Sequence, residues 1–93
     1  MITLVVPKNT VTYDGAIINT FHANIGEGLP RHDHAYTHLT MCVAGSLIIR
    51  KENLEHRMDK NSTPVNLKAA EWHEVEALED GTVFINVFAE NKS

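Results

Sequence analysis

The chain has 93 residues, of which 43% are apolar and 22% charged, and this composition predicts one globular domain with a single core. A net charge of −4 without a basic cluster argues against a nucleic-acid-binding protein. No apolar run approaches the ~18 residues of a membrane-spanning helix, and the first residues lack the features of a signal peptide. The single cysteine, Cys42, has no partner for an internal disulfide, so we expect a cytoplasmic protein.

In chain order, Val, Ile, Thr and Phe recur in short runs separated by Gly, Pro, Asn and Asp. These runs predict ten strands, at residues 3–6, 11–13, 16–25, 32–34, 38–43, 47–51, 54–58, 65–68, 73–78 and 82–89. The segment at 26–30, Gly-Glu-Gly-Leu-Pro, predicts a turn. Residues 66–78 have a helix-like composition but no clear N-cap, so we expect them to be extended. Many short strands at regular spacing indicate an all-β sandwich or barrel.

Four histidines carry the strongest chemical signal. His32 and His34 are two residues apart and would face the same side of a strand. On one continuous strand His38 would lie about 13 Å from His34, too far to share an ion. If residues 35–37 turn the chain, His38 opens the next antiparallel strand, about 5 Å from its cross-strand neighbour. His73 stands alone further along the chain. Imidazole is the commonest protein ligand of transition metals.

The spacing of this segment resembles the first motif of the cupin superfamily. Gly26 is followed by five residues and then His32-Asp33-His34, three further residues lead to His38, and six more to Gly45. Every fixed spacing of the motif is kept over residues 26–45. The motif's glutamate is replaced by His38, which changes the implied ligand set to four histidines.

The second cupin motif is degenerate, over residues 62–77. Of its fixed positions only the histidine, His73, is kept, and Ser62, Lys68, Ala70 and Ala77 stand at the others. The resemblance implies one small double-stranded β-helix (jelly-roll) barrel over residues 1–93. It also implies one divalent transition metal ion, Mn, Fe, Ni or Zn, held by the four histidines. Four neutral imidazoles leave the ion its full charge, which makes it a stronger Lewis acid.

Five further residues stand near the predicted ligands and are candidates for lining a pocket: Arg31, Tyr36, Thr40, Cys42 and Trp72. The period of two would turn Thr40 and Cys42 to the same side as His38. Simpler roles stay open for the others. Cys42 has the properties of a small buried hydrophobe, the two aromatic residues those of packing residues, and Arg31 those of a solvated surface cation. His22 and His56 lie outside the motif and are not expected to bind metal.

These features predict a metal-binding protein whose ligand or substrate is a small molecule. The resemblance implies a metal-dependent enzyme, with an oxygenase favoured slightly over an isomerase or lyase. No residue stands out as a general base, so a non-catalytic module that binds or senses a small ligand or a metal stays open as the alternative. We expect no nucleic-acid or membrane partner.

The small size of the chain and its short strands also predict a homodimer. A small domain buries a modest fraction of its surface, and unpaired strand edges need cover. The apolar run at residues 2–6, or the strand at 11–13, is expected to pair with the partner or to pack on its sheet. Cupins are commonly dimers, so the resemblance implies the same assembly.

Overall fold

The computed structural model describes residues 1–33 and 35–90, and every regular element in this part of the chain is a strand. The prediction of an all-β protein is confirmed. No helix in these residues is long and apolar enough to span a bilayer. The strands are β1 (Thr3–Leu4), β2 (Asn9–Tyr13), β3 (Ala16–Ala23), β4 (Glu27–His32), β5 (His38–Ala44), β6 (Ser46–Arg50), β7 (Glu55–Asp59), β8 (Val65–Leu67), β9 (His73–Ala77) and β10 (Thr82–Ala89).

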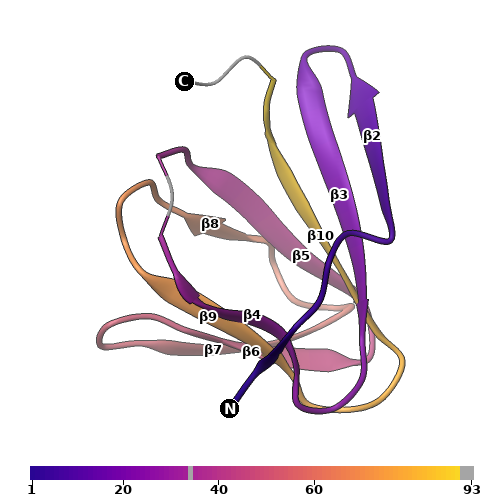
Figure 1. The fold of residues 1–93 in the computed structure, drawn as a ribbon, viewed down its shortest axis with the longest axis vertical. Helices are drawn as coiled ribbons and strands as arrows, with labels where there is room; N and C mark the ends of the chain where they lie inside the picture. Colours follow the sequence, from indigo (N-terminus) through magenta and orange to yellow (C-terminus); the bar gives the residue numbers. More distant parts are fainter. Residues whose placement is uncertain (34, 91–93) are drawn as a thin grey trace.

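The strands form two five-stranded sheets that face each other as the walls of a barrel (Figure 1). Sheet A has the order β1-β4-β9-β6-β7, and sheet B has the order β2-β3-β10-β5-β8. All strand pairs are antiparallel except β1 with β4, which is parallel. The predicted segment at residues 2–6 therefore begins as a strand that pairs within its own chain.

The core lies between the sheets, because side chains alternate along each strand and every second residue points inward. Phe84 of β10 stacks on Phe21 of β3 with ring centroids 4.8 Å apart. From sheet A, Leu47, Ile49 and Val75 are almost completely buried. This packed interior fixes the two sheets relative to each other, and so fixes where the ends of their strands meet.

Strand β4 corrects the sequence prediction of a turn at 26–30 and a strand at 32–34. The strand runs from Glu27 to His32 and contains both Gly28 and Pro30. A Cβ atom at Gly28 would collide with the carbonyl oxygen of Val75 in β9, so the glycine permits a close approach of two strands. Pro30 sits where the register with β9 shifts, between Leu29 and His32, which is a position that a strand proline tolerates.

The connection after β4 also differs from the prediction. The bend at residues 35–37 and the start of β5 at His38 are as expected. However, β4 belongs to sheet A and β5 to sheet B, so the chain crosses from one wall to the other instead of forming a hairpin. His38 is therefore not a cross-strand neighbour of the residues before the bend. The helix-like segment at 66–78 contains no helix, as predicted, but it is extended only in the end of β8 and in β9, with a turn at residues 69–70 between them.

Candidate metal centre

Three of the four predicted histidines come together at one end of the barrel. His32 is the last residue of β4 and His73 the first of β9, and the two are paired across sheet A. His38 reaches them from the start of β5 in sheet B. The ring centroids are 4.5 Å apart for His32 and His73, and 5.4 Å apart for His38 and His73. His34 lies outside the described residues.

In each of these three histidines, the Nδ1 atom lies near an oxygen of the protein. The Nδ1 atom of His32 is 2.7 Å from the carbonyl oxygen of Pro30, and that of His73 is 3.3 Å from the carbonyl oxygen of Glu71. A carbonyl oxygen only accepts, so both bonds place the ring proton on Nδ1. The tautomer that results has its lone pair on Nε2, which is the form that binds a metal through that atom.

The third imidazole is held by a buried polar pair. Thr40 Oγ1 donates to Asn86 Oδ1 at 2.7 Å and lies 3.2 Å from Nδ1 of His38. Since the hydroxyl hydrogen is used toward Asn86, the hydroxyl oxygen accepts from His38. Thr40 is completely buried and Asn86 nearly so. The sequence analysis missed Asn86. The alternation of inward and outward residues along the strand at 82–89 could have identified it, because it places this amide at an inward position among apolar residues.

The spacing of the rings agrees with ligands of one ion. Imidazoles bound through bonds of about 2.1 Å have centroids about 4.5 to 5.3 Å apart for bond angles between octahedral and tetrahedral values. The His32–His73 separation of 4.5 Å lies at the lower end of this range, and the His38–His73 separation of 5.4 Å lies just above it. Within residues 1–33 and 35–90, however, no group of three or more His, Cys, Asp and Glu side chains is arranged so that it could hold an ion as it stands. The four-histidine site therefore stays a prediction that includes His34.

Solved structures with the same architecture share little sequence with this chain. KdgF from a Halomonas species superimposes with a TM-score of 0.79, at 16% identity over 91% of this chain and 78% of its own. An RmlC-like cupin with a double-stranded β-helix fold, from Methanocaldococcus jannaschii, has a TM-score of 0.75, at 17% identity over 92% and 80%. A putative mannose-6-phosphate isomerase from Ralstonia eutropha has a TM-score of 0.70, at 22% identity over 92% and 82%.

The fold is the cupin double-stranded β-helix. No family model and no curated protein matches the sequence. The fold implied by the histidine motif is thus confirmed by the structure, while the identities of the matches are too low to transfer an activity.

Four of the five predicted pocket residues divide into two groups around the histidines. Tyr36 lies beside the site, with its ring 6.2 Å from that of His38 and 4.6 Å from that of Phe88. Arg31 is exposed and its guanidinium lies over the ring of Trp72, 4.0 Å from the centroid. The Arg31 charge is thus engaged in a cation–π contact on the surface. Tyr36 and Thr40 therefore lie in contact with the His38 ring, whereas Arg31 packs on Trp72.

Two surface pockets lie away from the histidines. One, of about 390 Å³, is lined by Trp72, Glu71, Leu54 and neighbouring residues of the β6–β7 turn. The other, of about 430 Å³, lies near the opposite end of β5 beside Val43 and Asp59. Neither pocket is lined by His32, His38 or His73. Trp72 therefore lines a neighbouring pocket that does not include the three histidines.

Cys42 lies in the core, where it faces Phe84 across β5 and β10. Its Sγ atom lies 3.3 Å from the carbonyl oxygen of Ala44, and burial raises the pKa of the Cys42 thiol. A raised pKa means that less thiolate, the reactive form, is present at neutral pH. We therefore expect a disulfide reagent to label the folded protein slowly at pH 7–8, and faster as the pH rises. Labelling should become rapid in guanidinium chloride, and equal rates in both states would show that the thiol is accessible.

Proposed function

We propose that this chain is a metal-dependent enzyme that acts on a small molecule, with His32, His34, His38 and His73 as ligands of one divalent transition ion. The observation that supports it is the convergence of three imidazoles from two different sheets, each with its Nδ1 atom beside an oxygen. Polar groups are costly to bury in a barrel core. Histidines that bind a metal typically have one ring nitrogen fixed by a protein oxygen in this way, which leaves the other nitrogen for the ion.

An ion held by His32, His34, His38 and His73 would supply Lewis acidity and could bind a substrate or O₂. The chain's own residues set the surroundings of that region. Thr40 and Asn86 orient His38, and Tyr36 with Phe88 forms an aromatic wall beside it. The carboxylate that follows His73 in sequence, Glu74, is turned away and bound by Arg50 at 2.9 Å, so it is not placed to move a proton at the site. We therefore favour oxygen-dependent cleavage, which does not require a side-chain base.

An isomerase is the second candidate, because a solved structure with this fold is described as a putative mannose-6-phosphate isomerase. Such a reaction uses the ion as a Lewis acid and needs no redox change. A non-catalytic module that binds a metal or a small ligand is the third. The three candidates differ in the metal ion that they need and in what would bind at an open coordination position of that ion, O₂ or the substrate.

The test is the metal content of protein purified without a histidine tag, followed by reconstitution of the metal-free protein with Fe²⁺ or Zn²⁺. We expect about one divalent ion per chain, and we expect the Fe²⁺ form to bind nitric oxide, a probe of open coordination positions, in its electron paramagnetic resonance spectrum. Tight binding of Zn²⁺ with no nitric oxide adduct of the Fe²⁺ form would contradict both the oxygenase and the isomerase, since each needs an open coordination position, and would favour the non-catalytic module. A protein that binds no divalent ion would contradict the proposal as a whole.

A further inference from the structure

Two asparagine side chains lie next to each other on the inner side of sheet B, beside the candidate metal centre. Asn86 of β10 and Asn19 of β3 are paired in the strand register. Each alternates with a buried phenylalanine of its own strand, Phe84 or Phe21, so both amides point into the barrel. Side chains opposed in this way have Cβ atoms about 4.5 to 5.5 Å apart. Asn86 is only 8% exposed, and Asn19 is half-buried.

Each of the two amides is oriented by a threonine hydroxyl on a neighbouring strand. Thr40 of β5 donates to Oδ1 of Asn86 at 2.7 Å. Thr10 of β2 donates to Oδ1 of Asn19, also at 2.7 Å. Strands β5 and β2 lie on opposite sides of the β3–β10 pair, so the two amide oxygens point away from each other. The two Nδ2 groups lie on the other side of each planar amide and therefore point toward a common region between β3 and β10. We call these two groups the amide pair.

The amide pair has donors without acceptors. An amide nitrogen carries two N–H donors and no lone pair for accepting. Within residues 1–33 and 35–90, the side-chain hydrogen bonds of Asn19 and Asn86 all use Oδ1, and none uses Nδ2. Neither Nδ2 atom is enclosed by protein on all sides, so both groups open to accessible space. Two adjacent donors of this kind need an oxygen acceptor between them.

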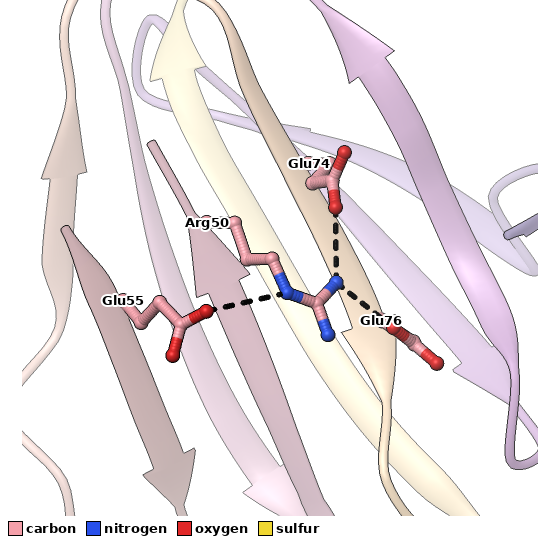
Figure 2. Close-up of polar contacts among 4 residues, drawn as sticks. All are labelled: Arg50, Glu55, Glu74 and Glu76. Atoms are coloured by element: carbon pink, nitrogen blue, oxygen red, sulfur yellow. Dashed lines mark hydrogen bonds and ion pairs between the residues drawn. The ribbon is translucent and has the colours of Figure 1, made fainter. Parts of the chain in front are cut away.

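The acidic side chains on the strands do not supply this acceptor. Along the described strands of sheet B, no inward position carries Asp or Glu. On sheet A, Figure 2 shows the carboxylates of Glu55, Glu74 and Glu76 turned toward Arg50. The two carboxylates of β9 alternate with buried residues, so this cluster lies on the outer side of the barrel. The acceptor for the amide pair is therefore expected to come from a bound molecule.

An apolar wall connects the amide pair to the candidate metal centre. Phe88 follows Asn86 on the same face of β10 and is paired with Ile17 of β3, which is half-buried. The Phe88 ring lies 4.6 Å from the ring of Tyr36, and the Tyr36 ring lies 6.2 Å from that of His38. A molecule that packs on this wall can reach the amide pair at one end and the histidines at the other.

We propose that the amide pair of Asn19 and Asn86 binds the oxygen of a carboxylate or carbonyl group in a small-molecule ligand whose apolar part packs on Phe88 and Ile17. A carbonyl oxygen has two lone pairs, and a carboxylate has two oxygens, so either group can accept from both amides at once. That this ligand is the substrate of the metal centre rests on the proposed function, whereas the binding of the oxygen at the amide pair does not.

The test follows the side-chain amide signals of Asn19 and Asn86 in nitrogen–proton correlation spectra of the full chain. The probes are benzoate, benzamide and benzylamine, which have the same ring but carry a charged acceptor, a neutral acceptor or no acceptor. We expect benzoate or benzamide, or both, to shift the two amide signals, and benzylamine to leave them unchanged. The probe that binds more tightly shows whether the preferred acceptor is charged. Each titration is run without metal and with one equivalent of Zn²⁺.

Two substitutions at Asn19 remove its donor in different ways. Asn19→Leu keeps the approximate shape and should weaken binding of the preferred probe about 10-fold, because one hydrogen bond to it is lost. Asn19→Asp should weaken binding of benzoate further by repulsion, while the Thr10 hydroxyl can still donate to the new carboxylate. The matched control is Asn66→Asp, since Asn66 is exposed on β8 and pairs with the outward Leu39. It should bind the probes like the parent. All three variants should keep the circular dichroism spectrum of the parent.

Four results would overturn this proposal: amide signals that no probe shifts, an unchanged affinity in both Asn19 variants, equal binding of benzylamine, or an equal loss in Asn66→Asp. The outcome is separable from that of the proposed function, because Asn19 holds none of the predicted ligands and its variants should bind Zn²⁺ like the parent. A chain that binds the probes but no metal would leave the amide pair as a binding site and contradict only the proposed function. A chain that binds Zn²⁺ but none of the probes would contradict only the present proposal.

Discussion

His73→Ala is expected to lower the affinity for a divalent transition ion by more than 100-fold while the barrel stays folded. Loss of an outer hydrogen-bond partner of a metal ligand already costs about 10- to 100-fold in affinity, and loss of the ligand itself should cost more. The His73 ring contacts both other described imidazoles, with its centroid 4.5 Å from that of His32 and 5.4 Å from that of His38. Its removal therefore takes away the predicted ligand whose ring contacts both His32 in sheet A and His38 in sheet B.

The measurement is a titration of the metal-free protein with Zn²⁺ and Mn²⁺. His38→Glu should still bind, with preference moving toward the harder ion, because a carboxylate oxygen replaces an imidazole. The control is His22→Ala, since His22 is exposed on the outer side of β3. If His73→Ala binds as tightly as the parent, His73 is not a ligand and the interpretation of the second motif is wrong.

Thr40→Val is the second change with a large expected effect, a 10- to 100-fold loss of metal affinity without loss of any ligand. Valine has nearly the shape of threonine but no hydroxyl group. The change removes the Thr40 hydroxyl that accepts from Nδ1 of His38 and donates to the buried Oδ1 of Asn86. The second loss should also lower the free energy of unfolding by about 1–3 kcal/mol.

Thr82→Val separates these two effects. Thr82 is also completely buried, and its hydroxyl bonds to the carbonyls of Ser46 and Glu79, away from the histidines. Both variants should be less stable than the parent, but only Thr40→Val should lose metal affinity. Nitrogen chemical shifts should also show a change of tautomer at His38 in Thr40→Val alone. Equal metal affinity in the two variants would mean that Thr40 is only a packing residue.

Much of the fold could be predicted because each strand carries its own signal. Alternating or β-branched runs ended by glycine or aspartate placed nine of the ten strands at about the right residues. Strand β4 failed because glycine and proline usually mark turns. In this protein Gly28 serves the close approach to β9 and Pro30 lies at a register shift, and neither reason is visible without knowing which strand is the neighbour.

The sequence analysis named the candidate ligands but not how the fold arranges them. The histidine spacing pointed to four residues; the structure brings the rings of His32, His38 and His73 together, and His34 lies outside the described residues. What the sequence could not supply was the pairing of His32 with His73 and the crossing of His38 to the other sheet, since both depend on contacts distant in sequence. Asn86 was hidden for the same reason: its partner Thr40 lies 46 positions away.

The position of β10 has a consequence for how the chain folds. This strand, at residues 82–89, lies in the middle of sheet B between β3 and β5, not at an edge. Until β10 is in place, Phe21 lacks its stacking partner Phe84. Strands β3 and β5 are then not joined in one sheet, because each of them pairs with β10. Closing such long loops is slow, so refolding should take milliseconds to seconds rather than microseconds. During synthesis the first 80 residues would expose an incomplete apolar sheet, which makes the nascent chain a substrate for chaperones.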